Sequence, residues 1–566
     1  MSDTDCDVCI IGSGAGGAPV AWRLAQAGLS VLVLEKGPWL ADQHFRKDEL
    51  ACCRRPVYTP EKRLEPHVVE DRNADGDWTA TPTSESGWDF WNGNLVGGSS
   101  NLMSGFFHRL KPVDFRQLEA FGPIDGANRV DWPIGYDDLE PYYDQVEQLV
   151  GISGAIAKHP NIEPRSSADF PYPPTLEHPV SAWIGQACEN LGYHALRVPR
   201  AILSRPALRR RSCEYSGYCG SFGCSSGAKG GARAAWLAPA LATGRCAIRS
   251  HAQVLRLISD ARGKVIAAEY ADAEGQRRQV TAKRFVVACQ AVETSRLLLN
   301  STGPKFPQGL ANNSGQVGRN LLFSAGGSGS GDLEYDALGP ERAAALKTMG
   351  PFVNRALDDW YVIKDQSFAA GPHKGGIVEF MLAHPNPTGL ANRAKWRDGE
   401  LLWGLPLKRR LEQWFRADRT LRFEVFCDWL PNDDCFVSLD PSVKDRWGQP
   451  VARIRIGHHA QDLKVGRYLA DKAERVLNEL GAARVRSSIS GSPPPNLMAG
   501  GCRFGTDPKT SVLDADCRAH EVENLYVTDG SFMPTGGSVP YTWTIYANAL
   551  RVAERMLGEK PTGRSS

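Results

Sequence analysis

The segment spanning residues 7–34, DVCIIGSGAGGAPVAWRLAQAGLSVLVL, constrains the fold more than any other part of the chain. Its apolar run Asp7–Ile11 predicts a buried strand. A helix is predicted over Ala18–Ala27, ended by Gly28, and a second buried strand over Val31–Leu34. A strand, a glycine turn, a helix and a strand in this order predict a βαβ unit, and with it a parallel sheet flanked by helices.

The glycines between the first strand and the helix have the spacing G-x-G-x-x-G, at Gly12, Gly14 and Gly17. In this context the first makes the turn, the second lets the backbone approach a pyrophosphate, and the third lets helix and strand pack closely. Glu35, at the end of the second strand, can accept hydrogen bonds from ribose hydroxyls and would repel a 2′-phosphate. The sequence therefore predicts a dinucleotide site.

The strands that would complete this fold lie far along the chain, at Phe285–Cys289 and Leu525–Gly530. A site for NAD usually finishes within one compact block. A binding domain split by a long insertion favours FAD as the dinucleotide.

Length and composition set wider limits. The chain has 566 residues, enough for several domains, and its formal net charge of +2 gives no global field for nucleic acid or a membrane surface. No stretch of about 20 apolar residues is present, so no membrane span is expected. The hydrophilic start MSDTDCD lacks the pattern of a signal peptide, and a cytoplasmic location is expected.

Changes of pattern along the chain predict its organisation. We expect a discontinuous FAD-binding domain, a lid or excursion, and a mostly antiparallel substrate-binding cap domain. The expected boundaries are 1–35, 90–120, 205–325 and 485–566 for the first, 36–89 for the second, and 121–204 with 326–484 for the third. Leu407–Phe423 reads as a basic amphipathic helix. Its exposed side is either a solvated face or a docking face for a partner or an anionic surface.

Five blocks of the sequence carry a family resemblance. They are the N-terminal unit ending in VLEKG, GNLVGGSSNLMSGFFHRLKPVDF, VVACQAVETSRLLLNS, QVGRNL and the C-terminal CRFGTDPKTSVLDADCRAHEVENLYVTDGSFMPTGGSVPYTWTIYANALRVAERM. Over nearly its whole length the chain resembles the glucose–methanol–choline (GMC) oxidoreductases, and most closely their bacterial sugar and alcohol dehydrogenase branch. The resemblance implies an α/β plus α+β fold, with a split Rossmann-like FAD-binding domain and an inserted, mostly antiparallel substrate domain.

The resemblance also implies the cofactor site. The residues expected at FAD are Gly12, Gly14, Ala15, Gly17, Glu35, Gly97, Gly98, Ser99, Asn101, Leu102, Met103, Val254, Asp529, Gly530, Tyr541 and Thr542. In some family members a histidine near the second block bonds covalently to FAD. Asn101 stands at the matching position and cannot form that bond, so non-covalent FAD is expected.

The family oxidises alcohols by transferring a hydride to flavin N5, with a histidine that removes the hydroxyl proton and a second His or Asn that binds the oxygen. In the family pattern these residues match Leu497 and Pro540 here. Neither side chain can exchange a proton, and a shift of one residue brings Asn496 rather than a histidine. His520 lies in the region nearby, but its family position is structural.

Three interpretations of this departure remain open. The first is oxidation of a sugar, glycoside or aryl alcohol with another base, from the cap domain or from Tyr541. The second is flavin-dependent desaturation, or oxidation of a phenolic or allylic substrate, beside an apolar wall of Leu497, Met498 and Pro540. The third is a non-catalytic or electron-relay subunit that still binds FAD.

The loop SCEYSGYCGSFGCSSGAKGG contains Cys213, Cys219 and Cys224. Thiolates in one glycine-rich loop can bind an iron–sulfur cluster, as in some dehydrogenases of the related branch. Their spacing is tighter than here, so zinc and plain buried thiols are the alternatives. Expected partners are a small-molecule substrate and an electron-acceptor protein or small subunit.

Overall fold

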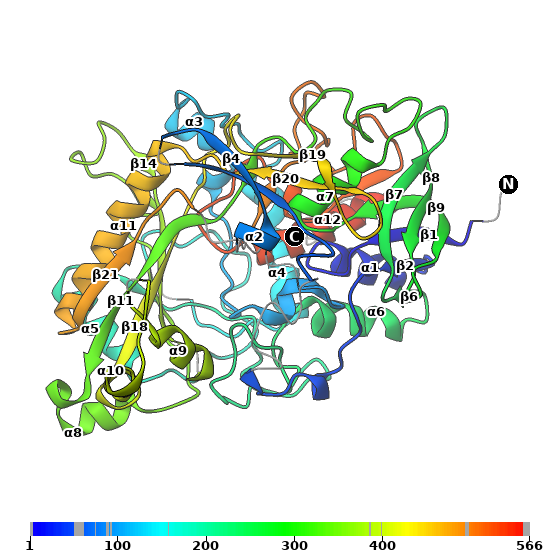
Figure 1. The fold of residues 1–566 in the computed structure, drawn as a ribbon. Coiled ribbons are helices and arrows are strands. Elements are labelled where there is room, and N and C mark those ends of the chain that lie inside the picture. The colour runs from blue at the N-terminus through cyan, green and yellow to red at the C-terminus, as the bar shows by residue number, and fades with distance from the viewer. Residues whose placement is uncertain are drawn as a thin grey trace.

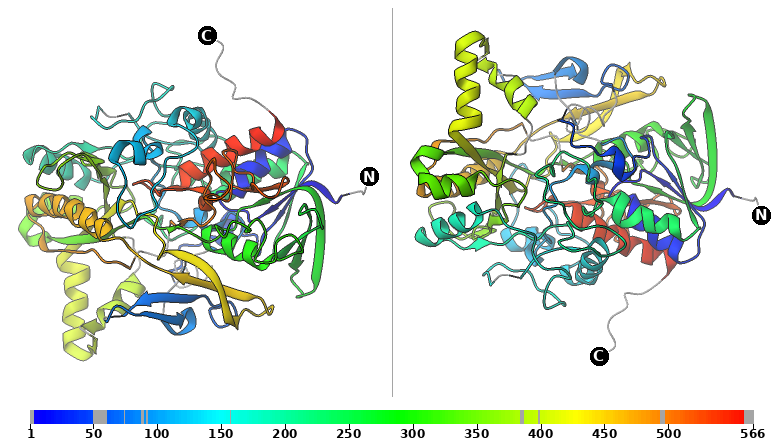
Figure 2. Two further views of the ribbon diagram at one scale, coloured as in Figure 1. Left: turned by 90° about the horizontal axis from the view of Figure 1, so that it is seen from above. Right: turned by 90° about the horizontal axis from the view of Figure 1, so that it is seen from below.

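The computed structural model describes residues 4–49, 61–73, 75–86, 90, 93–156, 158–383, 387–397, 399–492 and 497–558. Two large sheets dominate it, one at each side of the view in Figure 1, with helices packed against both. The views of Figure 2 show the N-terminal segment and the C-terminal helix together at the same end of the molecule.

The first sheet has the strand order β6-β2-β1-β9-β8-β7, and β23 also pairs with β9. Its strands are β1 (Cys6–Ile11), β2 (Val31–Leu34), β6 (Cys246–Arg249), β7 (Gln253–Ser259), β8 (Val265–Ala271), β9 (Arg277–Val287) and β23 (Leu525–Val527). β6, β2, β1, β9 and β23 are parallel, whereas β7 and β8 are antiparallel. The predicted βαβ unit is confirmed, with α1 (Gly17–Gln26) between β1 and β2.

A layer of helices covers one side of this sheet. α1 packs on α12 (Thr542–Leu557), which in turn packs on α4 (Tyr136–Val150). These apolar faces join β1, β9 and β23 in one continuous core. Burial of this core is the main stabilising term of the fold, and it adds to the backbone pairing of β1 and β23 with β9.

The second sheet has six antiparallel strands in the order β21-β11-β18-β15-β12-β5. They are β5 (Ala195–Leu196), β11 (Ala325–Glu334), β12 (Arg355–Leu357), β15 (Gly376–Leu382), β18 (Asp418–Cys427) and β21 (Ala483–Ser488). α11 (Ala460–Glu479) packs on one face of this sheet. Along β18, Leu421, Phe423 and Val425 are buried in that core, so the residues between them point to the opposite face.

A third sheet of four strands has the order β19-β20-β3-β4. β3 (Val68–Arg72) and β4 (Trp78–Pro82) form a hairpin within the predicted excursion, and β3 pairs in parallel with β20 (Pro450–Arg455). β19 (Phe436–Lys444) completes it. The excursion is therefore tied into the chain by backbone hydrogen bonds as well as by surface contacts.

β6 joins β2 at the edge of the first sheet, whereas β7 and β8 form a hairpin. One sequence prediction is corrected. The helix expected over Leu407–Phe423 ends earlier: α10 (Gly404–Glu412) continues as the helical turn η7 (Gln413–Ala417), and β18 follows. Thr420, Leu421 and Phe423 instead extend a sheet, which β-branched and aromatic residues favour.

The remaining elements are short or peripheral. The helices are α2 (Thr83–Ser86), α3 (Gln117–Phe121), α5 (Val180–Asn190), α6 (Ala238–Ala242), α7 (Ala291–Asn300), α8 (Tyr335–Leu346) and α9 (Pro387–Ala394). Short helical turns are η1 (Asp42–His44), η4 (Gly98–Leu102), η5 (Pro112–Phe115), η6 (Arg233–Leu237) and η8 (Gly530–Phe532). The two-residue strands are β10 (Leu321–Leu322), β13 (Val362–Ile363), β14 (His373–Lys374), β16 (Trp396–Arg397), β17 (Glu400–Leu401) and β22 (Ala499–Gly500).

Candidate active site

A cavity of about 780 Å³ lies between the two large sheets. The carboxyl ends of four parallel strands open into it, at Gly12, Glu35, Ala288 and Asp529. Residues of β11, β15, β18 and β21 form the opposite wall. The carboxyl edge of a parallel sheet is where this class of fold binds its ligands.

The glycine turn after β1 is closely packed except at one position. A Cβ atom on Gly12, whose φ is +94°, would lie 2.3 Å from the Ala288 carbonyl oxygen, and one on Gly17 would lie 2.1 Å from the Gly12 carbonyl oxygen. Gly14 differs, because a Cβ there would meet no atom within 4 Å. Gly14 therefore borders open cavity at the start of α1, where a phosphate can approach the backbone amides.

Glu35 holds three segments together beside this turn. Its carboxylate accepts hydrogen bonds from the Ser13 hydroxyl (2.6 Å), the Ser13 amide (3.1 Å) and the Gly37 amide (2.9 Å). The Gly97 amide donates to the same Ser13 hydroxyl at 2.9 Å. Burial raises the pKa of the Glu35 carboxyl, and the hydrogen bonds from Ser13 and Gly37 oppose that rise.

Asp529 fixes the turn after β23. One of its oxygens accepts from the Thr294 hydroxyl at 2.5 Å and from the Gln290 amide at 2.9 Å, and the other accepts from the Ser531 amide at 2.9 Å. Burial raises the pKa of this carboxyl as well. Its hydrogen bonds join the loop after β9 to the loop after β23.

Thirteen of the sixteen predicted cofactor residues line the cavity. These are Gly12, Gly14, Ala15, Glu35, Gly98, Ser99, Leu102, Met103, Val254, Asp529, Gly530, Tyr541 and Thr542. The other three, Gly17, Gly97 and Asn101, are not among the residues that line the cavity. The buried Asn101 side chain donates to the carbonyls of Val96 and Gly98, so it braces the loop from within rather than facing a ligand.

These features fit FAD. The open face at Gly14 leaves room for a pyrophosphate, and the helix starts at α1 and at Thr542 present amides to the same cavity. The lining includes Gln253 and Arg296 as well as Leu497 and Tyr541. One continuous cavity thus has space for both halves of a dinucleotide.

The positions that match the family's catalytic pair both lie in the lining of the cavity. Leu497 and Pro540 line the cavity together with Met498, and no histidine is among the described lining residues. Asn496 lies outside the described residues. His520 does not line the cavity, and its ring contacts the Ser511 hydroxyl at 3.0 Å.

Tyr541 also lines the cavity, and its burial affects the pKa of its phenol. Tyr541 is fully buried, and this burial, together with the nearby charge of Asp428, raises the pKa of its phenol well above the ordinary value. The phenol therefore keeps its proton at neutral pH. A protonated phenol can donate a hydrogen bond, and the role of Tyr541 as the base stays a prediction.

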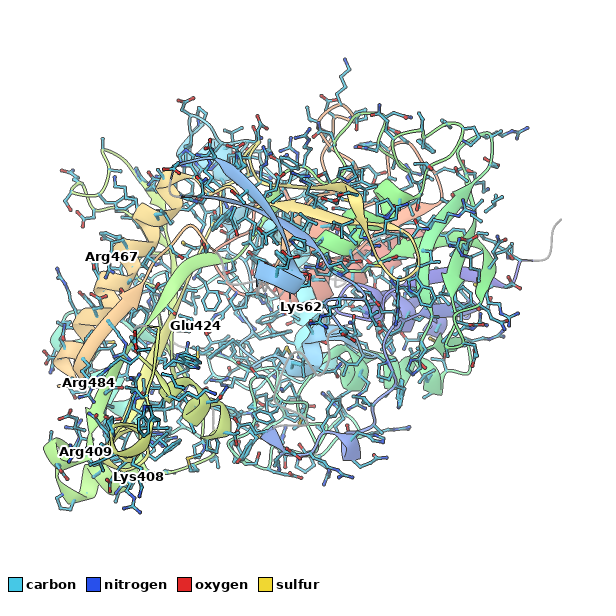
Figure 3. The ribbon with its side chains drawn as sticks, viewed as in Figure 1. Lys62, Lys408, Arg409, Glu424, Arg467 and Arg484 are labelled. Carbon is cyan, nitrogen blue, oxygen red and sulfur yellow. The ribbon has the colours of Figure 1, made fainter. Side chains whose placement is uncertain are left out.

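The sheet-side wall was not predicted from the sequence. Ser328 on β11, Arg422 and Glu424 on β18, and Ser488 at the end of β21 all line the cavity. Glu424 pairs directly with Ser328 on one side and with Glu379 on the other, so the three share one face of the sheet. Figure 3 shows Glu424 on this strand pair. The alternation in TLRFEVF, apolar residues between Arg422 and Glu424, is the signal that could have revealed this face.

Gln290 is a further residue that the sequence did not indicate. It lines the cavity with φ +79° and ψ 152°, a backbone conformation that side chains other than glycine rarely adopt. Its side-chain oxygen accepts from the Val292 amide at 3.0 Å and so caps α7. Strain of this kind persists where the surroundings fix the backbone, as Asp529 does here through the Gln290 amide.

Cys213, Cys219 and Cys224 all line a smaller cavity beside the first. Burial raises the pKa of Cys213 to about 12, whereas the charge of Lys229 and hydrogen bonds from Ser226 and the Lys229 amide lower that of Cys224 despite burial. In the part of the chain that the structure describes, no three or more His, Cys, Asp or Glu side chains gather as metal ligands. The iron–sulfur and zinc alternatives therefore have no support.

Comparison with known proteins agrees with this site. The GMC oxidoreductase family matches at residues 80–324 and 431–549, and a profile of FAD-dependent oxidoreductases matches at residues 7–75. The chain is 33% identical to 6'''-hydroxyparomomycin C oxidase of Streptomyces lividus over 100% of this chain and 94% of the relative. It is 31% identical to 2-methyl-1,2-propanediol dehydrogenase of Mycolicibacterium austroafricanum over 97% and 94%.

A solved structure shows the same fold. The formate oxidase of Aspergillus oryzae superposes with a TM-score of 0.64 at 17% identity, over 98% of this chain and 99% of the other. None of the helices within the described residues is both long and apolar enough to cross a membrane. The chain belongs to the GMC oxidoreductase family and is an FAD-dependent oxidoreductase that acts on CH–OH groups of its donors.

Proposed function

We propose that this enzyme oxidises a hydroxyl group of a polyhydroxylated, sugar-like substrate, and that Glu424 accepts the hydroxyl proton in place of the family's histidine. One observation carries the proposal: Glu424, a carboxylate on β18, lines the same cavity as Leu497 and Pro540. FAD, which we propose is bound non-covalently, supplies the hydride acceptor when bound.

Among the described residues, five carboxylates line the cavity: Glu35, Glu293, Glu424, Asp445 and Asp529. Glu35 and Asp529 hold loops of the dinucleotide fold. Glu293 lies 2.6 Å from His67 and 3.2 Å from Arg296. Asp445 accepts from Arg296 at 2.6 Å. Glu424 is the one contributed by the six-stranded sheet among the described lining residues, and it is therefore our candidate for the proton acceptor.

The polar residues of the six-stranded sheet and the apolar residues at Leu497, Met498 and Pro540 would have different roles in the reaction. Removal of a hydride from the carbinol carbon must be accompanied by loss of the hydroxyl proton, and a carboxylate positioned at the substrate can accept it. Ser328, Arg422 and Ser488 are placed to hydrogen-bond further hydroxyl groups. Leu497, Met498 and Pro540 would keep water away from the reacting carbon.

Behind Glu424 the sheet carries a second polar pair. Glu379, directly opposite on β15, is fully buried, and His108 approaches it at 2.6 Å. Its second carboxylate oxygen makes no hydrogen bond within the described chain. We propose that this pair fixes the position of Glu424 and can pass its proton onward through the sheet face.

The polar wall supports a hydroxyl-rich substrate over the alternatives. Five serines, at positions 324, 328, 488, 490 and 492, line the cavity with Arg422 and Glu424. A desaturated, phenolic or allylic substrate would offer these groups fewer hydrogen-bond partners, and each group that it desolvated without a partner would cost about 1–3 kcal/mol. The relative named for 6'''-hydroxyparomomycin C, an aminoglycoside, and the relative named for a propanediol are consistent with a polyol.

Anaerobic bleaching of the bound flavin by a substrate panel tests the proposal. Polyols, sugars and aminoglycosides should bleach it, and simple aryl alcohols or phenols should do so slowly or not at all. Bleaching confined to phenolic or allylic compounds would overturn the proposal in favour of base-free chemistry. A normal flavin spectrum without bleaching by any of them would favour the non-catalytic subunit.

Two broader expectations stay proposals. One is the domain boundaries given above. The other is an electron-acceptor protein or small subunit that reoxidises the flavin. Reoxidation rates with dioxygen, a quinone and a cytochrome would test the acceptor directly, because only the physiological class should sustain turnover.

A further inference from the structure

Residues 396–397 and 399–417 form an exposed arm between β15 and β18. The hairpin β16–β17 is followed by α10 and η7, and neither α10 nor η7 contains a buried residue. In both views of Figure 2 the lime helix of this region stands away from the body of the molecule. A helix without buried residues has little tertiary packing to hold it, so its outer face is open to a partner.

The arm concentrates exposed apolar side chains. Trp403 is 79% exposed and Leu405 57% exposed, and Trp396, Leu401 and Phe415 are also largely open to solvent. Single exposed apolar residues are ordinary, but five within twenty residues of one projecting element form a patch. Such a patch in a soluble fold marks a surface that contacts something else.

The same outer face is basic. Leu407, Leu411 and Trp414 recur at helical spacing and are half-buried, so they face the protein. The exposed side of the helix presents Lys408, Arg409 and Arg416 beside Leu405 and Phe415. The segment Gly404–Ala417 contains four basic residues and one acidic residue, whereas the whole chain has a net charge of only +2. Its positive charge is therefore local.

This combination points to one kind of occupant. We propose that the arm docks the enzyme on an anionic lipid surface, with Trp403 and Leu405 in the headgroup region and the basic residues on the lipid phosphates. Tryptophan prefers that interface, and each Lys or Arg close to an anionic membrane contributes about 1 kcal/mol. The helix is convex, so a fluid surface can meet it without a shaped groove. A second copy of the chain would bring two basic helices together, which opposes a symmetric dimer.

Vesicle co-sedimentation of the FAD-loaded enzyme tests the proposal. Vesicles of phosphatidylglycerol mixed with phosphatidylcholine should retain the enzyme at least about tenfold better than phosphatidylcholine alone, and added salt should release it. The double substitution Lys408→Glu with Arg409→Glu should abolish that preference. Trp403→Ser with Leu405→Ser should remove the blue shift of tryptophan fluorescence on vesicles while flavin content stays unchanged.

The chain contains a matched control. Lys62 and Arg63 precede Leu64, which is 44% exposed, so they form a basic pair beside an exposed leucine away from the arm (Figure 3). Lys62→Glu with Arg63→Glu should bind vesicles like the unmodified enzyme. Equal binding to both vesicle types, or an equal loss in the control, would overturn the proposal. A concentration-dependent dimer that Trp403→Ser with Leu405→Ser abolishes would assign the patch to a second copy instead.

Discussion

The two walls of the cavity differ in chemistry and in origin. The wall that we assign to FAD has Leu497, Met498 and Pro540 at its proposed reacting end, and these side chains cannot exchange protons. The sheet-side wall consists of serines with Arg422 and Glu424. The family resemblance locates its proton acceptor on the first wall. The difference suggests how the family's histidine could be replaced. The cofactor-binding residues would stay as in the family, while Glu424 on β18 would accept the proton.

Of the substitutions considered, Glu424→Gln should lower kcat the most. It keeps the size and hydrogen-bonding capacity of the side chain but cannot accept a proton, so kcat should fall by about 10²- to 10⁴-fold. Flavin content and thermal stability should be unchanged, and Ser488→Ala serves as a control on the same wall. Loss of activity no larger than in that control would break the division of roles between the walls.

Gly12→Ala and Gly14→Ala test the cofactor wall as a matched pair. At Gly12 the new Cβ would clash with the Ala288 carbonyl, and φ is +94°, so the free energy of unfolding of the apoprotein should fall by about 2–4 kcal/mol. At Gly14 the Cβ would enter open cavity. The apoprotein should then unfold within about 1 kcal/mol of the original, while FAD affinity falls at least about tenfold.

Urea unfolding of the apoproteins and FAD titration measure the two effects separately. If Gly14→Ala bound FAD with unchanged affinity, the pyrophosphate would not pass beside Gly14. That result would contradict the assignment of the FAD wall and leave the sheet-side wall untouched.

Leu497→His places an imidazole at the position that matches the family's catalytic histidine, and so tests whether that position can still hold the base. In the Glu424→Gln background it should raise the rate of flavin reduction about tenfold, because an imidazole titrates near neutral pH. It should also shift the visible spectrum of the flavin. An unchanged spectrum together with an unchanged rate would mean that Leu497 does not lie beside the flavin ring.

Tyr541→Phe should have the smallest effect. Because burial raises the pKa of Tyr541, the phenol is protonated throughout the working range, and its removal deletes a hydrogen-bond donor rather than a base. The rate should fall about fivefold or less, and the pH profile between about pH 6 and 9 should keep its shape. A profile that changes shape in this range would restore Tyr541 as the titrating group.

Most residues proposed for the cofactor half of the site were predicted from the sequence, and the structure shows that they line the cavity. Local spacing determined Gly12, Gly14 and Glu35, since a glycine turn between a strand and a helix has only one common use. Asp529 followed from the family resemblance, which joins segments that no local pattern connects. Asn101 was placed in the right loop, but its role as an internal brace depends on carbonyls that only the folded loop brings together.

The substrate-binding half of the site was harder to predict from the sequence. Glu424 lies in a segment first interpreted as the end of a basic helix, because Leu407–Phe423 has helical periodicity that continues into β18. Short amphipathic runs fit both periods, and the pairing of β18 with β11 and β15 decides between them. The neighbours of Glu424, including Glu379 and Ser328, come from strands about 45 and 100 residues away, so their meeting is a property of the sheet.

Chemical rescue of Glu424→Gln by acetate tests the central claim most directly. The rate of anaerobic flavin reduction by a substrate that bleaches the unmodified enzyme would be measured against acetate concentration. If Glu424 is the proton acceptor, acetate should restore part of the rate in Glu424→Gln and leave the unmodified enzyme unaffected. A Glu424→Gln rate equal to that of the unmodified enzyme, or a slow rate that acetate does not change, would contradict the account.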